Sequence, residues 1–353
     1  MTRHALIAGA SGIIGRHLAE HLYETGGWAI SGLSRHGHDL PKGVRGISAD
    51  LTDAASVRNA LKDVNPTHIF ITTWSRQASE AENCRVNGAM VENLLAAVAG
   101  KNVEHVALVT GLKHYMGPFE AYAKSRPVTP FREEQPRLSY PNFYYTQEDA
   151  VYAAASKQGF TWSVHRPHTL IGYAVGNAMN MASTLSAYAA ICRETGKPFV
   201  FPGSPEQYNA AVDVTDGRII AKQLRWAATT PDAHNEAFNI TNGEVFRWNW
   251  MWPKIASYFF LTPGEYPGHA QPLETMMAGT EPVWDKIVSK FGLQKNPLSA
   301  VASWWHSDMD LGRTIENFTD MTKSRDMGFL EYQNSVRSFT DAFDRLRRAR
   351  IMP

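Results

Sequence analysis

The sequence has little cysteine, no excess of charge and no long apolar run. Its 353 residues include two cysteines, Cys84 and Cys192, too few for a disulfide framework, which favours a reduced, cytoplasmic location. Lysine and arginine total 35 against 34 acidic residues, a formal net charge of +1, which argues against a nucleic-acid binder that relies on positive charge. No apolar run approaches the roughly 18 residues of a membrane span. Residues Met1 to His4 leave no room for a secretory signal before the first apolar run.

Short apolar runs alternate with amphipathic segments along the first half of the chain. We expect strands at 5–8, 28–33, up to 48, 68–72, 105–110 and 162–166, and helices at 13–23, 53–61, 80–98 and 142–156. After Pro167 the pattern loosens, with helices at 181–194, 216–228, 248–259 and 336–348 and a strand at 237–240. This alternation predicts an α/β fold with a Rossmann-type doubly wound parallel sheet. The sheet domain is expected over residues 1–170. A smaller C-terminal substrate-binding lobe is expected over 171–353, with some elements returning to the sheet.

A glycine-rich turn follows the first expected strand and opens the first helix. Its sequence is Gly9-Ala10-Ser11-Gly12-Ile13-Ile14-Gly15. The first glycine permits a tight turn, the second lets a pyrophosphate approach the backbone, and the third lets the helix pack against the sheet. The N–H groups of the helix N-terminus then face the phosphates. The turn therefore predicts dinucleotide binding, rather than a purely structural turn.

The Gly-x-x-Gly-x-x-Gly spacing resembles the short-chain dehydrogenase/reductase superfamily, extended type. That resemblance implies a contact between Asp50, followed by Leu51, and the adenine amino group. NAD-specific folds place an acid after the second strand to hold the ribose 2′-OH, but here the chain reads Ser34-Arg35-His36. Arg35 is expected to pair with a 2′-phosphate, so we predict NADP(H) as the cofactor. The alternative is that Arg35 is simply a solvated surface residue.

The usual catalytic pair of this superfamily, Tyr-x-x-x-Lys, is missing. Glu148 stands four residues after Tyr144, and Asp149 stands four residues after Tyr145. A carboxylate beside a phenol raises its pKa and cannot replace a lysine. Either the chain has lost catalysis and only senses NADP(H), or the cation comes from elsewhere. Lys113, which follows the fifth expected strand, is the obvious source, because ligands bind at the carboxyl ends of such strands.

Two motifs around these residues resemble one family, the progesterone 5β-reductase/iridoid synthase-like enone reductases. They are Thr110-Gly111-Leu112-Lys113-His114-Tyr115 and Asn142-Phe143-Tyr144-Tyr145-Thr146-Gln147-Glu148-Asp149. Further matches at Trp74, 117–120, 162–167, 245–248 and 328–330 extend the resemblance over nearly the whole chain. The resemblance implies that Tyr144 and Lys113 are the catalytic residues. It also implies NADPH-dependent 1,4-reduction of the activated C=C bond of an α,β-unsaturated carbonyl compound.

Other expected site residues follow from the carboxyl ends of the strands and from the resemblance. Further cofactor contacts are expected at Thr72, Thr110, Pro167, Thr169 and Leu170. The expected substrate pocket comprises Trp74, Phe119, Tyr145, His168 and Trp305, although packing is favoured for Tyr145 because only one tyrosine needs to face the nicotinamide. The chain departs from the family at His168-Thr169, where Gly-Asn is common, and at His36, where the family has a second basic residue.

The expected partner is a small apolar enone or enal, with no nucleic acid and no membrane. No metal site is expected, because the histidines lack a spacing such as His-Glu-x-x-His. The oligomeric state stays open, with a homodimer as the candidate. Two other functions stay open: a non-catalytic NADP-sensing regulator, and a sugar-nucleotide epimerase or dehydratase, which would need the missing Tyr-x-x-x-Lys pair.

Overall fold

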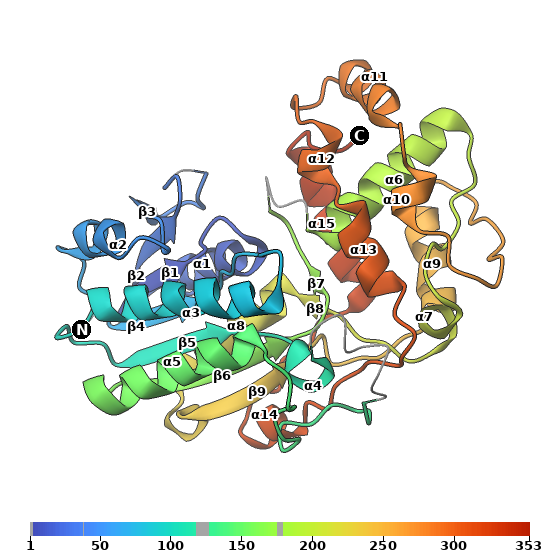
Figure 1. Cartoon of the computed structure of the whole chain (residues 1–353). Coiled ribbons are helices and arrows are strands. Elements are labelled where there is room, and N and C mark those ends of the chain that lie inside the picture. Colours follow the sequence, from blue (N-terminus) through green and yellow to red (C-terminus); the bar gives the residue numbers. More distant parts are fainter. Residues whose placement is uncertain (1–2, 38, 118–126, 175–178) are drawn as a thin grey trace.

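The computed structural model describes residues 3–37, 39–117, 127–174 and 179–353. Its central feature is a seven-stranded sheet with the order β3-β2-β1-β4-β5-β6-β9, in which all neighbouring strands are parallel (Figure 1). The strands are β1 (Arg3–Ala8), β2 (Trp28–Ser34), β3 (Val44–Ser48), β4 (His68–Ile71), β5 (His105–Val109), β6 (Thr161–Pro167) and β9 (Glu236–Ile240). The strand order reverses direction between β1 and β4, as in a doubly wound sheet. The predicted fold class is therefore confirmed.

Helices cover both faces of the sheet, and the side-chain alternation of β1 shows how. Leu6 and Ala8 pack in one buried cluster with α2 (Ala54–Leu61), α3 (Glu80–Ala97) and α5 (Phe143–Gln158). Ala5 and Ile7 pack in another with α1 (Ile13–Thr25) and α8 (Gly217–Thr229). Successive side chains of a strand point to opposite faces, so a strand covered on both faces must be apolar throughout.

A third buried cluster forms the core of a separate, mainly helical lobe. Its larger helices are α6 (Met181–Thr195), α9 (Trp248–Tyr258), α11 (Glu281–Phe291) and α15 (Ser335–Arg348). Aromatic rings fill this core: Phe199 and Trp252 stack with ring centroids 4.4 Å apart. Shorter helices complete the lobe, namely α7 (Pro205–Asn209), α10 (Leu273–Met276), α12 (Leu298–Val301) and α13 (Trp304–Leu311).

Several short elements complete the fold. The strands β7 (Leu170–Ile171) and β8 (Thr215–Asp216) form a small parallel pair. Also short are α4 (Lys113–Met116), the 3-10 helix η2 (Pro231–Ala233) and α14 (Thr322–Asp326). α8 and β9 follow residue 170 in the chain but pack with the sheet lobe. The domain limits 1–170 and 171–353 stay a prediction.

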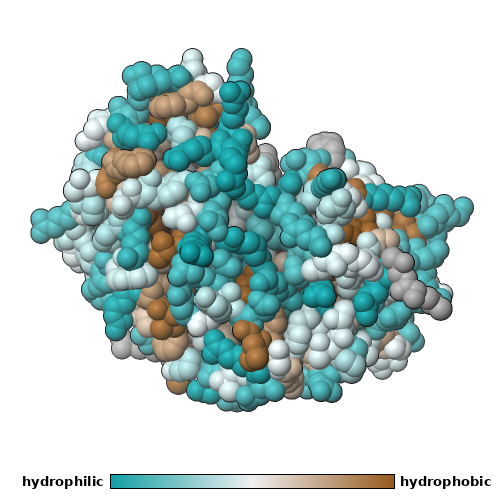
Figure 2. Space-filling view, turned by 180° about the vertical axis from the view of Figure 1, so that it is seen from behind, coloured by the Kyte–Doolittle hydropathy of each residue, from teal (hydrophilic) through white to brown (hydrophobic). Residues whose placement is uncertain are grey.

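The face of the molecule that Figure 2 shows is mostly polar. The layer that contains α1 and α8 lies behind the sheet in Figure 1 and faces the viewer in Figure 2, where hydrophobic residues form small, separate patches. Within the described ranges, no helix is both long enough and apolar enough to cross a membrane.

Candidate active site

The glycine-rich turn between β1 and α1 has the geometry of a phosphate cradle. Gly9 has a φ of +89° and its N–H donates to the carbonyl of Leu33 at 2.9 Å. A Cβ at Gly15 would lie 2.3 Å from the carbonyl oxygen of Gly9, so only glycine fits there. Gly12 is the N-cap of α1 and provides no side-chain cap, which leaves the first N–H groups of the helix available to an anion. This cradle fits a dinucleotide pyrophosphate, with Ser11, Ile13 and Ile14 beside it.

The residues after β2 and β3 lie at the surface. Arg35 and His36 are exposed, and the Ser34 hydroxyl accepts a hydrogen bond from the N–H of Gly37 at 3.0 Å. The Asp50 carboxylate accepts hydrogen bonds from the backbone and the hydroxyl of Thr52, which lower its pKa, and Arg35 lowers it further. Arg35 and the expected adenine contact therefore share one edge of the fold. Leu51 is buried there.

Two residues of this region were not anticipated from the sequence. Arg16 of α1 is buried and pairs with Asp39, with 3.2 Å between its Nη2 and the Asp39 Oδ2. The loop after β2 therefore does contain an acid, but Asp39 stands five residues after Ser34, the last residue of the strand, and is paired with Arg16. Arginine at the fourth position of the helix gave no recognisable sequence signal.

A threonine follows each of the strands β4 and β5, and the two hydroxyl groups differ in their hydrogen bonding. The Thr72 hydroxyl donates to the carbonyl of Ala8 at 2.8 Å and so ties β4 to the start of the cradle. Thr110 is buried, and its hydroxyl has no hydrogen-bond partner within the described residues. A buried polar atom of this kind at a strand terminus fits contact with a ligand. Trp74 is 39% exposed and stacks on Phe143, with ring centroids 5.5 Å apart.

The Tyr144 side chain crosses to the end of β5. A Cβ built on Gly111 would lie 3.1 Å from the Tyr144 hydroxyl oxygen and 3.3 Å from the carbonyl oxygen of Pro167. The hydroxyl therefore lies above Gly111, where the ends of β5 and β6 meet. Any larger residue at 111 would crowd it. Gly111 is thus a site residue whose role only the structure reveals.

Lys113 begins α4, directly after β5, and its side chain is 12% exposed. Its Nζ lies 3.9 Å from the Glu80 Oε2 and 5.1 Å from the centre of the Phe143 ring. The other carboxylate oxygen of Glu80 accepts a hydrogen bond from the N–H of Phe143 at 2.9 Å. Glu80, at the start of α3, therefore connects α4 and α5 at the edge of the sheet where the strands end.

Asn142 links the backbones of the two expected catalytic residues. Its Oδ1 accepts from the N–H of Tyr144 at 3.0 Å, and its Nδ2 donates to the carbonyl of Lys113 at 2.8 Å. The first bond makes Asn142 the N-cap of α5. One buried side chain thus begins the tyrosine helix and holds the lysine segment against it.

Glu148, four residues after Tyr144, belongs to a buried ion network. Its carboxylate is 2.7 Å from Arg137 Nη2, 3.4 Å from Arg166 Nη2 and 3.7 Å from His114 Nδ1. Burial raises its pKa, but the neighbouring His114 ring and the charge of Arg166 outweigh this and hold the pKa below its ordinary value. Asp149 also pairs with Arg137, at 2.8 Å. Both carboxylates of the second motif are therefore engaged in ion pairs with arginines.

Tyr145 is buried beside this network. Its hydroxyl donates to the carbonyl of His114 at 2.6 Å and accepts from the N–H of Leu138 at 3.0 Å, and burial raises its pKa. The hydroxyl has both partners inside the protein, as expected for a packing residue. A role in the substrate pocket stays a prediction.

His168 follows β6 and is held by three side chains of the C-terminal half. Its Nδ1 lies 2.6 Å from the Asp213 Oδ1, and its Nε2 lies 2.7 Å from Arg313 Nη1 and 2.6 Å from Asn317 Nδ2. A guanidinium can only donate, so Nε2 accepts and the ring hydrogen lies on Nδ1, toward Asp213. The sequence gave no signal for this cluster, because its partners lie 45 to 149 residues away.

The remaining expected residues lie between the lobes or outside the described ranges. The Thr169 hydroxyl donates to Asp310 Oδ2 at 3.2 Å, and Leu170 opens β7. Arg76, from the loop after β4, lies over the Trp305 ring of α13, 3.6 Å from its centroid, and so bridges the lobes. Phe119 falls outside the described residues. Within the described ranges, no group of three or more His, Cys, Asp or Glu side chains could hold a metal ion.

Comparison with known proteins identifies the family. The sequence model of the PRISE-like Rossmann-fold domain matches residues 43–353. (S)-8-oxocitronellyl enol synthase of Nepeta racemosa is 40% identical over 363 residues, covering 99% of this chain and 93% of that protein. 3-oxo-Delta(4,5)-steroid 5-beta-reductase of Arabidopsis thaliana is 40% identical over 364 residues, with the same coverage.

Solved structures with a similar fold are more distant in sequence. UDP-glucose 4-epimerase of Thermotoga maritima, in complex with UDP-glucose, superposes with a TM-score of 0.68 at 16% identity and covers 98% of this chain and 99% of its own. The Bordetella bronchiseptica enzyme WbmH, in complex with NAD+, gives 0.66 at 15% identity, with the same coverage. At such identities the likeness concerns the fold alone. The family match and the full-length relatives confirm what the two central motifs predicted: the chain belongs to the PRISE-like Rossmann-fold family.

Proposed function

We propose that this protein catalyses the NADPH-dependent 1,4-reduction of the activated C=C bond in a small, apolar enone or enal. The observation that carries the proposal is the position of the Tyr144 hydroxyl above Gly111, at the carboxyl ends of β5 and β6. Asn142 ties Tyr144 to the segment of Lys113, while Glu148 is occupied by arginines. The names of two relatives, a 3-oxo-Delta(4,5)-steroid 5-beta-reductase and an 8-oxocitronellyl enol synthase, agree with this chemistry.

The chain's own residues would act on the carbonyl end of the substrate. NADPH, when bound, supplies a hydride for the β-carbon. Negative charge then develops on the carbonyl oxygen as an enolate forms. The Tyr144 hydroxyl donates a hydrogen bond to that oxygen and stabilises the charge, as an oxyanion-hole donor does. Lys113 adds a positive field, and solvent protonates the enolate carbon.

The choice of NADP(H) over NAD(H) rests on Arg35. It is exposed after β2, and no acid follows that strand directly. NADPH should therefore bind more tightly than NADH, and Arg35→Ala should weaken NADPH binding by about 10- to 100-fold, the value of one charge-assisted contact. Titration of both cofactors measures this. Arg58→Ala, which removes an exposed arginine of α2, is the control, and equal affinities of the unmodified protein for NADPH and NADH would contradict the prediction.

The location of the transferred hydride tests the proposed reaction. Conjugated enones and enals are incubated with C4-deuterated NADPH, and the label is located by NMR. We expect deuterium at the β-carbon and an intact carbonyl group. Deuterium at the carbonyl carbon would indicate an ordinary carbonyl reductase. Tight NADPH binding without transfer to any enone would favour the sensing role, and turnover of sugar nucleotides would favour an epimerase.

A cytoplasmic location is part of the proposal. It is supported by Cys84 and Cys192, which are both free thiols in the structure, as is usual in a reducing compartment. Imaging of the tagged full-length protein in its own cell tests it, and a signal in a secretory compartment would contradict it.

A further inference from the structure

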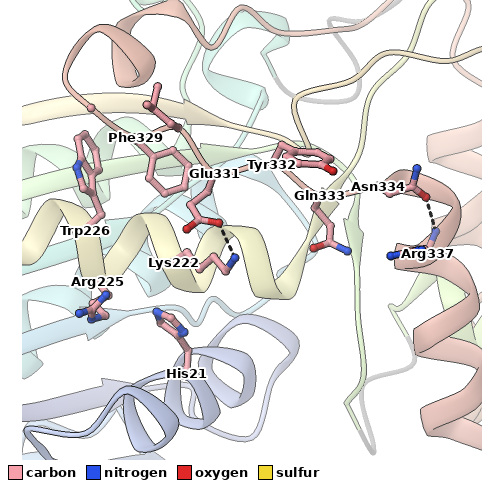
Figure 3. Close-up of a pocket in the computed structure, with 12 residues that line it drawn as sticks. His21, Lys222, Arg225, Trp226, Phe329, Glu331, Tyr332, Gln333, Asn334 and Arg337 are labelled. Carbon is pink, nitrogen blue, oxygen red and sulfur yellow. Dashed lines mark hydrogen bonds and ion pairs between the residues drawn. The ribbon is translucent and has the colours of Figure 1, made fainter.

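A cavity of about 720 Å³ lies away from the candidate active site, on the face of the sheet lobe covered by α1 and α8 (Figure 3). Its floor is formed by these two helices. Its wall is the segment 328–334, which leads from α14 to α15. The cavity is within the size range of small-molecule sites. None of its lining residues belongs to the glycine-rich turn or to the Tyr144 site.

The wall of the cavity is anchored in a defined position. Phe329 is buried against Trp226, with ring centroids 5.4 Å apart. The N–H of Gln333 donates to the carbonyl of Asn242 at 2.9 Å. Glu331 pairs with Lys222 of α8 at 2.6 Å. Tyr332 lies between these anchors and is 73% exposed, so its ring is available to a flat ligand.

Positive charge exceeds negative charge around the cavity. Lys222, Arg225 and Arg337 line it, with Glu331 as the single lining acid. Glu331 is already paired with Lys222. Within the described part of the chain, the guanidinium groups of Arg225 and Arg337 form no hydrogen bond and no ion pair.

A polar atom at the floor also lacks a partner. The Nε2 of His21 is buried and has no hydrogen bond to any described residue. In Figure 3, His21 and Arg225 lie next to each other at the end of the cavity nearest Trp226. The Arg225 guanidinium therefore lies beside the His21 ring, whose Nε2 is closed off from solvent. An anion bound to Arg225 would act on this ring through its charge and not through a hydrogen bond.

From this arrangement we propose that the cavity binds an aromatic anion, with its carboxylate or phosphate at Arg225 and Lys222, next to the His21 ring, and its own ring against Tyr332. Guanidinium groups bind both kinds of anion through charge-assisted hydrogen bonds. The exposed ring of Tyr332 provides the stacking surface. The site is independent of the proposed reductase activity and of the dinucleotide cradle.

Calorimetric titration of the protein saturated with NADP+ tests the proposal, because the saturated cradle cannot take up the probe. The probes are 1-naphthyl phosphate, 2-naphthoate, inorganic phosphate and neutral 2-naphthalenemethanol. We expect at least one naphthyl anion to bind. The anion that binds more tightly shows whether the site prefers a phosphate or a carboxylate. Inorganic phosphate or the neutral alcohol binding as tightly as the naphthyl anions would overturn the proposal, as would no binding of either anion.

Variants locate the bound anion. Arg225→Gln should weaken binding about 10-fold or more, and Arg225→Lys should restore part of it. Arg58→Gln makes the same change of charge at an exposed site on α2 and should leave binding unchanged. Equal affinities for Arg225→Gln and Arg58→Gln would overturn the proposed position.

The His21 ring gives a second readout that does not depend on affinity. Burial lowers the pKa of His21, and the charges of Arg225 and Lys222 lower it further, while Glu331 raises it. An anion placed among these groups must raise the pKa of His21, which NMR titration of its ring proton follows with and without the probe. A bound naphthyl anion that leaves this pKa unchanged would place the ligand elsewhere and overturn the proposal.

Discussion

The phenol and the cation of the candidate site come from two different elements of the fold. Tyr144 lies in the first turn of α5, as expected, but the residue one turn later is Glu148, which faces Arg137 and Arg166. The candidate lysine is Lys113, the first residue of α4, in the segment that follows β5. A cation and a phenol therefore reach the same strand ends from different elements.

The tyrosine pair allows a direct comparison of two phenols in one helical turn. Tyr144→Phe removes the proposed donor to the enolate oxygen and should lower turnover by roughly 10²–10³-fold, with NADPH binding retained. Tyr145→Phe removes a hydroxyl whose hydrogen bonds, among the described residues, join it to the backbone of His114 and Leu138. This change should lower stability by about 1 kcal/mol and turnover far less. Steady-state kinetics and urea unfolding of both variants measure this. The reverse order of activities would show that the wrong tyrosine has been chosen.

Asn142 can be tested separately as a helix cap and as a link to Lys113. Asn142→Ser keeps a capping oxygen for α5 but loses the Nδ2 donor that holds the carbonyl of Lys113. A displaced Lys113 segment should lower turnover by at least about tenfold, with the helix content preserved in circular dichroism. Asn334→Ser is the matched control, since Asn334 caps α15 at an exposed position. If both variants keep full turnover, the link to Lys113 has no catalytic role.

At the scale of elements, the close contact between the glycine-rich turn and α1 fixes the position of the helix N-terminus, where the dinucleotide phosphates are expected. The helix approaches the turn so closely that a methyl group at Gly15 would overlap the backbone at Gly9 and Ala10. The backbone at both positions is fixed by β1 and its hydrogen bond to β2. The turn therefore cannot widen without moving the start of the helix.

Gly15→Ala should disturb both stability and the cradle. The added Cβ would lie 2.3 Å from the Gly9 oxygen, and such overpacking costs about 1–3 kcal/mol. NADPH affinity should fall as α1 moves. Gly12→Ala is a milder change for stability, because its Cβ would lie 3.3 Å from the same oxygen. Urea unfolding and NADPH titration of the two variants check the order, and an equally stable Gly15→Ala protein would contradict the close approach.

At the scale of the whole molecule, a buried polar chain runs between the sheet and α8. The ring nitrogens of His165 lie 2.9 Å from the Ser163 hydroxyl and 2.8 Å from the Gln223 side-chain oxygen, and Ser163 also lies 2.9 Å from His105. Burial lowers the pKa of His165 to about 4, although the hydrogen bond to Gln223 opposes this. Burial also lowers the pKa of His105. The folded protein therefore holds these rings neutral where an unfolded chain would bind protons.

Because the pKa of His165 is lower in the folded protein than in the unfolded chain, the free energy of unfolding should fall as the pH falls. Above about 6.5 neither state protonates His165, and its full contribution to stability is present. As pH falls from 6.5 toward 4, the unfolded chain gains the proton first, so stability is lost, on the order of 3 kcal/mol for this residue. Urea unfolding between pH 7.5 and 4 measures the slope.

Replacement of the ring isolates this contribution. His165→Gln cannot titrate, so its free energy of unfolding should fall less steeply over the same pH range, whatever its value at pH 7.5. His269→Gln, at an exposed position, should leave the slope unchanged. Identical slopes for His165→Gln and the unmodified protein would contradict the prediction.

The sequence by itself determined the parallel sheet, the cradle and the motifs around Lys113 and Tyr144. Apolar periodicity and glycine spacing are local properties, because they follow from backbone geometry within a strand, a turn or a helix. The helix expected at 142–156 is present as α5, with Asn142 as its N-cap. The two-residue strands β7 and β8 were missed, because a pair this short has no periodicity and joins segments far apart in the chain.

Only the tertiary structure decided which side chains meet at the site. Gly111 below the Tyr144 hydroxyl, the arginines around Glu148 and the three partners of His168 all come from other elements. Nothing in the local sequence encodes these contacts, since they require the sheet to place the ends of β5 and β6 side by side and the second lobe to pack against them. Local sequence patterns specify the helices and strands. The contacts between side chains depend on burial and on charge pairs between distant residues, as for His168, whose partners lie 45 to 149 residues away in the chain.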